Sequence, residues 1–262
     1  MKKNREKIIF FGNGPLADYV LEVLEQKFEI VFHAREKADL EEACRLKKED
    51  PSIHGVLASF GVLIKSDVLE VFEPEGILNV HPSLLPLYRG ASPIESAILN
   101  GDLEFSVSVM KLVKAMDAGP VYYQTTLSNL PLQKTEIYKV LAETGAKWIC
   151  ENLTNLPEPF LQDDTKATFC GKFDKEMGIL TPETDSAEKT FRKIVAFQGY
   201  PKPKYAFFGK KCIILDAHIL ESGKTADLEI ECADGQSVAI DKLQPEGRKV
   251  MDAKSFLNGY RR

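Results

Sequence analysis

Residues 8–14 read Ile-Ile-Phe-Phe-Gly-Asn-Gly, an apolar run that ends in two closely spaced glycines. Such a short apolar run, bounded by turn residues, predicts a strand that is buried on both faces. Apolar residues then recur at helical spacing from Leu16 to Leu24, so a helix is expected after the turn. A buried strand that passes through a tight turn into a helix is typical of α/β proteins with a parallel sheet.

The alternation of short strands and helices continues to about residue 152. Working outward from the first strand, we expect further strands at residues 29–32, 55–59, 76–80, 105–112 and 121–125. Helices are expected between and after them, at residues 38–48, 65–72 and 135–152. This order predicts a mostly parallel sheet with helices on both faces.

The second part of the chain has a different pattern. Pro157 and Pro159 interrupt the helical spacing, and Ser186 is a suitable N-cap for a helix at residues 187–197. Short strands follow, with the turn Asp234-Gly235 before the last of them, at residues 211–217, 227–232 and 237–243. The pattern predicts a small antiparallel barrel or sheet. We expect a domain at residues 1–170, a linker at 171–185 and a second domain at 186–262.

The charge of the chain differs between these two parts. The formal net charge of all 262 residues is -5, which gives no general sign of nucleic-acid binding. Residues 171–262 contain 16 Lys and Arg against 14 Asp and Glu, a net charge of +2, whereas residues 1–170 contain 18 against 25, a net charge of -7. The second part is therefore compatible with a polyanionic partner.

The cysteines and the N-terminus exclude several classes of protein. The five cysteines are widely separated and form no CxxC pair, and no histidine lies near one of them at metal-ligand spacing. We expect reduced thiols, no metal site and a cytoplasmic location. The apolar run at residues 8–11 is too short for a signal sequence or a membrane span.

The turn Gly12-Asn13-Gly14 resembles the phosphate-binding turn of dinucleotide-binding proteins only in part. Ala17 stands where the third glycine of that motif is usual, and His33-Ala34-Arg35 follows the second strand where an acidic residue would bind a ribose. A tight strand-to-helix turn explains the glycines. A nicotinamide-dependent oxidoreductase is therefore a weak alternative for the function.

The segment Asn79-Val80-His81-Pro82-Ser83-Leu84-Leu85-Pro86 is more specific. Strand alternation places Asn79 and His81 on the same face, at the carboxyl end of a strand, where open α/β sheets bind their ligands. The two prolines restrict the loop that follows. From these residues alone, His81 can also be a hydrogen-bonded structural histidine and Asn79 an amide that caps the loop.

Three segments together resemble the folate-dependent formyltransferases: residues 79–86, Tyr88-Arg89-Gly90-Ala91-Ser92-Pro93-Ile94, and Met116-Asp117-Ala118-Gly119. Within that family, residues 90–94 and the closing segment 243–259 are most similar to the members that act on tRNA. The resemblance spans nearly the whole chain. It implies a Rossmann-like catalytic domain with an open, mostly parallel sheet, followed by a small C-terminal OB-like β-barrel domain.

The resemblance also implies a reaction and its catalytic residues. The formyl group of 10-formyltetrahydrofolate would pass to the α-amino group of initiator methionyl-tRNA, for translation initiation. Asn79 and a protonated His81 would donate hydrogen bonds to the formyl oxygen, and one such donor lowers a barrier by ~3–4 kcal/mol. Asp117 would accept the proton that the amine loses. Without the resemblance, Asp117 is interpreted as a turn residue.

Further site residues follow from the same resemblance. The folate is expected to contact the loop of Phe60, Gly61 and Leu63, where Phe60 replaces the usual Tyr, and the turn that contains Ser83, Leu84 and Pro86. The amine substrate is expected to contact Arg89, Gly90, Lys210, Lys211 and Arg248. Two alternatives stay open: Arg89 as an ion pair that holds its loop, and the basic residues as a solvated face. We expect a monomer.

The chain departs from the tRNA-specific members in one stretch. Only residues 33–54 connect the second strand to the Phe60 loop, whereas those members carry tens of additional residues there, including a basic loop that inserts into the tRNA acceptor end. The second acceptor to consider is therefore an amino sugar linked to a nucleotide. A non-catalytic tRNA-binding protein is also conceivable, but the intact catalytic positions argue against it.

Overall fold

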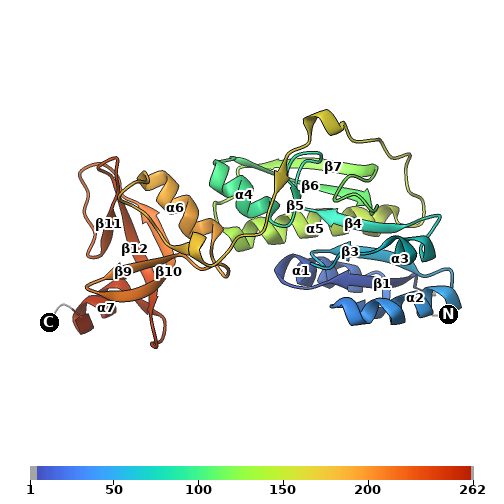
Figure 1. Ribbon diagram of the computed structural model, residues 1–262, viewed down its shortest axis with the longest axis horizontal. Coiled ribbons are helices and arrows are strands. Elements are labelled where there is room, and N and C mark those ends of the chain that lie inside the picture. Colours follow the sequence, from blue (N-terminus) through green and yellow to red (C-terminus); the bar gives the residue numbers. More distant parts are fainter. Residues whose placement is uncertain (1–4, 261–262) are drawn as a thin grey trace. The chain divides into compact units, whose positions relative to one another are not determined.

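The computed structural model describes residues 5–260, which form two compact units (Figure 1). The first unit contains the chain up to residue 94 together with residues 103–171. The second contains residues 95–102 and the chain from residue 172. The expected division into a domain at 1–170, a linker at 171–185 and a domain at 186–262 stays a prediction.

The first unit is built on a six-stranded sheet in the order β2-β1-β3-β4-β6-β7. The strands β1 to β4 run parallel to one another, whereas β6 is antiparallel to both of its neighbours, β4 and β7. This confirms the predicted open, mostly parallel, Rossmann-like sheet. The strand bounds are Lys7–Gly12 (β1), Glu29–Ala34 (β2), His54–Ala58 (β3), Ile77–His81 (β4), Glu104–Lys111 (β6) and Val121–Ser128 (β7). A short parallel pair, Arg89–Gly90 (β5) and Phe169–Cys170 (β8), lies outside the sheet.

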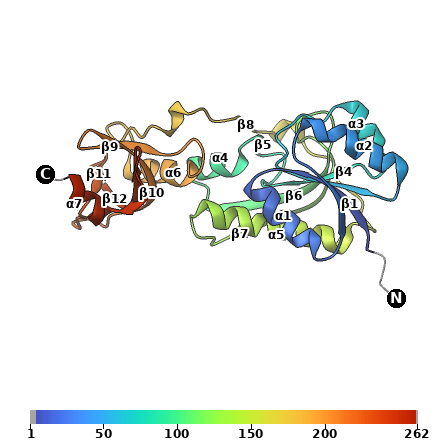
Figure 2. The same ribbon diagram turned by 90° about the horizontal axis from the view of Figure 1, so that it is seen from below.

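Helices cover both faces of this sheet (Figure 2). On one face α1 packs against α5, and on the other α2 and α3 pack together over Ile9 and Phe11. The four apolar residues 8–11 are fully buried for this reason. The helices of this unit are Pro15–Glu25 (α1), Leu40–Glu49 (α2), Ser66–Val71 (α3) and Lys134–Asn152 (α5), with the 3-10 turns Lys37–Asp39 (η1) and Asp164–Lys166 (η2). Most of the helix Pro93–Asn100 (α4) belongs to the second unit. The sequence had not indicated α4.

The turn after β1 requires glycine for packing. A Cβ atom on Gly12 would lie 2.5 Å from the Ala58 carbonyl oxygen and 2.8 Å from the Cβ atom of Ala17. Gly14 has a φ angle of 91°, in the left-handed region that favours glycine. The close approach of helix and strand thus accounts for both glycines as parts of a tight turn.

The second unit contains an antiparallel sheet in the order β11-β12-β10-β9, with β13 paired to β12. Its core joins this half-barrel sheet to α6 and α7. This confirms the predicted small antiparallel β domain of OB-like type. The elements are Glu176–Gly178 (η3), Ala187–Ala196 (α6), Lys204–Phe207 (β9), Lys210–Ile219 (β10), Glu229–Glu231 (β11), Ser237–Pro245 (β12), Met251–Asp252 (β13) and Ala253–Tyr260 (α7). Sequence patterns missed β9, which begins directly after Pro203, and α7.

Polar groups fix the start of α6 to the segment that precedes it. The Ser186 hydroxyl accepts a hydrogen bond from the Lys189 amide at 3.2 Å, which confirms the predicted N-cap. Asp185, only 3% exposed, accepts hydrogen bonds from Thr181 Oγ1 at 2.8 Å, Lys189 Nζ at 2.6 Å and Lys193 Nζ at 2.5 Å. Burial by itself raises the pKa of Asp185, but these hydrogen bonds outweigh it and lower the pKa from 3.8 to about 2.

We expect Asp185→Asn to lower the free energy of unfolding by about 2 kcal/mol at neutral pH, since the amide loses two charged hydrogen bonds. A carboxyl whose pKa is lowered by folding stabilises the protein above its unfolded pKa, near 4, and this contribution is lost as the pH falls towards 2. Denaturant titrations at several pH values measure both effects. The exposed Asp216 provides the matched control, Asp216→Asn. Equal stability of wild type and Asp185→Asn at pH 7 would contradict the prediction.

Within residues 5–260, every helix is too short or too polar to cross a membrane. All five cysteines lie within the described residues, and none of them is in a disulfide.

Candidate active site

The site lies at the carboxyl edge of the parallel strands. Asn79 pairs with Leu57 of the neighbouring strand β3, and Ala58 pairs with Gly12, so three loops leave the sheet side by side at this edge. Asn79 and His81 occupy alternate positions of β4 and are 4% and 5% exposed. They therefore share one face of the strand, as the sequence predicted.

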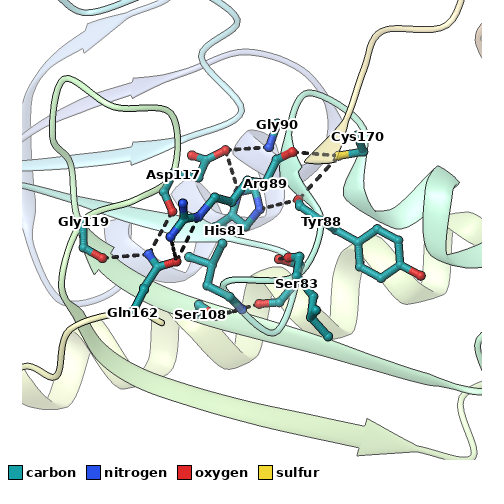
Figure 3. Close-up of polar contacts among 12 residues, drawn as sticks. His81, Ser83, Tyr88, Arg89, Gly90, Ser108, Asp117, Gly119, Gln162 and Cys170 are labelled. Carbon is teal, nitrogen blue, oxygen red and sulfur yellow. Dashed lines mark hydrogen bonds and ion pairs between the residues drawn. The ribbon is translucent and has the colours of Figure 1, made fainter. Parts of the chain in front are cut away.

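His81 is held from two sides (Figure 3). Its Nε2 atom lies 3.1 Å from the Tyr88 carbonyl oxygen, which can only accept, so Nε2 carries a proton. Its Nδ1 atom lies 3.8 Å from Asp117 Oδ2. The ring plane is thereby set, and Nδ1 is the nitrogen that faces the carboxylate.

Asp117 is contributed by the loop between β6 and β7. Its φ angle is 47°, a left-handed conformation that is uncommon outside glycine. Its Oδ2 atom accepts a hydrogen bond from the Gly90 amide at 2.8 Å, and its side chain is 14% exposed. The structure thus brings Asp117 beside His81, although it is also the turn residue that local sequence indicated.

Asn79 is almost buried, and yet its side-chain amide is not engaged in a hydrogen bond with the described residues. Among residues 5–260 it has no hydrogen-bond partner, although it is only 4% exposed. Among the described residues no fully buried side-chain nitrogen or oxygen lacks a partner, so the polar atoms of Asn79 must reach the solvent although the residue as a whole is nearly buried. Its two N–H donors are available to a bound oxygen atom.

The loop after β3 combines buried anchors with exposed backbone. Phe60 and Ile64 are each 5% exposed and belong to the core, where Phe60 contacts Phe11 edge to face. Between them Gly61 has a φ angle of 68° and Leu63 is 73% exposed. Within the described chain, the backbone N–H and C=O groups of residues 61–63 have no partner. These groups can receive a planar polar ligand, while the Phe60 ring serves packing.

The turn after β4 is fixed by hydroxyl and amide groups. Ser83 Oγ donates to the Leu87 carbonyl at 2.6 Å, and Ser108 Oγ on β6 donates to the Ser83 carbonyl at 2.6 Å. Gln124 on β7 donates to the Leu85 carbonyl at 2.7 Å. Ser83 therefore serves the loop itself, whereas Leu84 is 38% exposed and Pro86 is partly exposed.

Arg89 has its guanidinium inside the protein. The side chain is 5% exposed, and its Nη2 atom donates to Gln162 Oε1 at 2.7 Å and to Asp164 Oδ1 at 2.6 Å. This favours the alternative in which Arg89 holds its loop, rather than a substrate contact. Gly90 has a φ angle of 122°, and a Cβ atom there would lie 2.1 Å from the Cys170 carbonyl oxygen. Only glycine fits where this amide reaches Asp117.

The basic residues predicted for substrate binding gather in the second unit. Lys210 and Lys211 begin β10 and line a hollow of about 330 Å³ with Gly209, Pro245 and Glu246. The Arg248 amide donates to the Pro245 carbonyl at 3.0 Å, which places Arg248 in the turn beside them. All three basic side chains are exposed. The structure therefore collects Lys210, Lys211 and Arg248 at one end of the antiparallel sheet.

Several residues that shape the site were not found from the sequence. Ser108 lies on the polar face of an alternating strand, but the turn of residues 83–87 covers it and it is fully buried. Gln162 donates from Nε2 to the carbonyls of Asp117 and Gly119 at 2.8 and 2.7 Å, although it is 45 residues from Asp117 in sequence. The only sequence signal for a role of Ser108 is that it is a polar residue among the apolar residues of its strand. In the residues that the structure describes, no His, Cys, Asp and Glu side chains cluster in a way that could hold a metal ion.

Comparison with known proteins identifies the family of this chain. Residues 8–153 match the formyl transferase family model, and residues 172–261 match that of the formyl transferase C-terminal domain. A curated relative, the methionyl-tRNA formyltransferase of Carboxydothermus hydrogenoformans, is 37% identical over 221 residues, which are 79% of this chain and 71% of the relative.

Two solved structures share the fold. HypX from Aquifex aeolicus in complex with tetrahydrofolic acid has a TM-score of 0.74 and 18% identity, and the match covers 98% of this chain and 48% of that one. The methionyl-tRNA formyltransferase from Clostridium thermocellum has a TM-score of 0.66 and 18% identity, over 95% of this chain and 99% of that one.

Proposed function

Because the chain belongs to the formyl transferase family, we propose that it transfers the formyl group of 10-formyltetrahydrofolate to the α-amino group of initiator methionyl-tRNA, for translation initiation. The observation that carries this proposal is the combination of a free, nearly buried Asn79 amide with the His81 imidazole 3.8 Å from the Asp117 carboxylate. The 37% identity to a curated methionyl-tRNA formyltransferase supports tRNA, rather than an amino sugar, as the acceptor.

The folate carrier supplies the formyl carbon on a nitrogen that can leave. We assign to its binding Phe60, Gly61, Leu63, Ser83, Leu84 and Pro86. Gly61 and Leu63 offer unpaired backbone groups, and Leu84 offers an exposed apolar side chain. Phe60 and Ser83 act by holding these two loops, since both are buried. The free backbone donors and acceptors of residues 61–63 fit a polar heterocycle such as a pterin.

Asn79 is the proposed donor to the formyl oxygen. Negative charge develops on that oxygen as the amine attacks, and the Asn79 N–H groups, which have no partner among residues 5–260, are carried by a residue of the buried strand β4. A fixed donor of this kind is worth ~3–4 kcal/mol of barrier. No internal hydrogen bond of the described residues has to break before Asn79 can donate.

His81 and Asp117 are proposed to handle protons and orientation. The amine nitrogen forms a bond to the formyl carbon and loses a proton, while the bond from that carbon to the carrier nitrogen breaks and that nitrogen gains a proton. Asp117 accepts the proton from the amine, since Gly90 occupies only its Oδ2 atom, and this proton then passes, directly or through water, to the carrier nitrogen, so that Asp117 is a carboxylate again at the end of the reaction. His81 donates a hydrogen bond from Nε2 to the Tyr88 carbonyl. Nδ1 is therefore the ring nitrogen that can exchange a proton with Asp117 or donate to a reactant.

The second unit is proposed to bind the tRNA backbone. Lys210, Lys211 and Arg248 lie at one end of its sheet and are exposed, as phosphate-binding residues have to be. Gly90 is proposed to lie next to the acceptor amine, because its amide donates to the Asp117 carboxylate, which accepts the proton of that amine. Since its substrate is a charged tRNA, the proposed enzyme works in the cytoplasm, and we propose that it works as a monomer.

The test is to incubate the purified protein with 10-formyltetrahydrofolate and either methionyl-tRNA or a set of nucleotide-linked amino sugars. We expect formylmethionyl-tRNA and an equal amount of tetrahydrofolate. Formylation of the amino sugars alone would show that the acceptor is an amino sugar and not methionyl-tRNA, while the proposed formyl transfer from the folate would stand. Absence of formylation with every acceptor would overturn the proposed function.

A further inference from the structure

The segment of residues 160–170, here called the strap, connects the two loops of the active site. At its start, Phe160 exchanges two backbone hydrogen bonds of 2.9 Å with Val121, next to the Asp117 loop. Near its end, the Thr168 carbonyl accepts from the Arg89 amide at 2.9 Å, and Thr168 Oγ1 accepts from the Tyr88 amide at 2.8 Å. The strap therefore contacts the loop of Asp117 and the loop of Tyr88 to Gly90.

Gln162 makes the direct link between these loops (Figure 3). Its Nε2 atom donates to the carbonyls of Asp117 at 2.8 Å and Gly119 at 2.7 Å. Its Oε1 atom accepts from Arg89 Nη2 at 2.7 Å and from Arg89 Nε at 3.1 Å. Both donors and both lone pairs of the amide are used, so one side chain joins the two loops without spare capacity.

The Asp117 loop needs such support. Asp117 adopts a φ angle of 47°, a left-handed conformation that is strained for a residue other than glycine. The Gln162 amide binds the carbonyl of this very residue. The carboxylate of Asp117 is in turn directed by the Gly90 amide, which belongs to the loop that Gln162 holds through Arg89.

We propose that Gln162 is a positioning residue for formyl transfer: its amide sets the distance between the Asp117 carboxylate and the His81 ring by tying the two loops together. This inference rests on the proposed function for its kinetic consequence, but the geometry can be tested without catalysis. Gln162 contacts neither reactant in this scheme and acts only through Asp117 and Arg89.

Two substitutions separate the roles of the two ends of the amide. Gln162→Met keeps the length of the side chain and removes all four hydrogen bonds. Gln162→Glu keeps the acceptor for Arg89 but replaces the donors to Asp117 and Gly119 by a carboxylate oxygen. If the donors position Asp117, both variants lose kcat by ~10- to 100-fold, the cost of a displacement of about 1 Å, while both KM values stay within about twofold.

The matched control is Gln26→Met, because Gln26 also donates to a backbone carbonyl, that of Glu22 at 3.3 Å, at the exposed end of α1. We expect its kcat to equal that of the wild type. Full activity of Gln162→Glu would overturn the proposal, since it would show that only the contact with Arg89 matters. A rise in KM at constant kcat would do the same.

Amide hydrogen exchange provides the readout that does not depend on activity. The Gly90 N–H donates to the Asp117 carboxylate, so its exchange is expected to become at least ~10-fold faster in Gln162→Met and Gln162→Glu and to stay unchanged in Gln26→Met. If Gly90 exchanges faster in the Gln162 variants but the wild type formylates no acceptor, the proposed function is refuted and the positioning role of Gln162 stands. Unchanged exchange at Gly90 would refute the positioning role.

Discussion

Asn79→Ala is expected to fold normally and bind both substrates, yet to lose about 100- to 1000-fold in kcat. The loss is large because a donor to developing charge contributes mainly in the transition state, where its partner is most negative. Folding is spared because the Asn79 amide has no partner among residues 5–260, so its removal leaves no group there unpaired.

Steady-state kinetics of Asn79→Ala with both substrates, together with a thermal melt, measure these effects. Asn152→Ala is the matched control, because the Asn152 amide donates to the Trp148 carbonyl within its own helix, at the end of α5. Its kcat should equal that of the wild type. A variant with unchanged kcat and a raised KM would place Asn79 in ground-state binding and remove its proposed catalytic role.

Asp117→Asn is expected to lower kcat by about 100- to 10,000-fold, the usual contribution of a general base. The amide is nearly the same shape as the carboxylate, and its oxygen can still accept from the Gly90 amide, so the loop should keep its conformation. What the variant lacks is a group that can take a proton from the attacking amine.

Single-turnover kinetics of Asp117→Asn isolate the chemical step from product release. The control is Asp18→Asn on the exposed surface of α1, which should leave the rate unchanged. The hydrogen exchange of Gly90 serves as a check that the loop is intact. A rate near that of the wild type with an intact loop would show that the proton leaves by another route, through water or the acceptor itself.

Local patterns in the sequence were sufficient for most of the fold. Apolar runs and helical spacing predicted the strands and helices of the sheet because burial on two faces leaves a continuous apolar signature. Elements without such a signature were missed: α4 lies inside a motif, β9 follows two prolines, and α7 contains Ser255 and Gly259, which favour helices weakly.

The sequence by itself also determined that Asn79 and His81 share one face at the end of a strand, since alternation along a strand needs no knowledge of the rest of the chain. Only the tertiary structure decided that Asp117 meets His81, that Arg89 is turned inward, and that Gln162 joins their loops. These contacts connect residues far apart in sequence: Asp117 lies 36 positions from His81, and Gln162 lies 45 positions from Asp117 and 73 from Arg89. Which residues meet in these contacts depends on how the strap folds against the sheet. The short-range periodicity of the sequence contains no information on this.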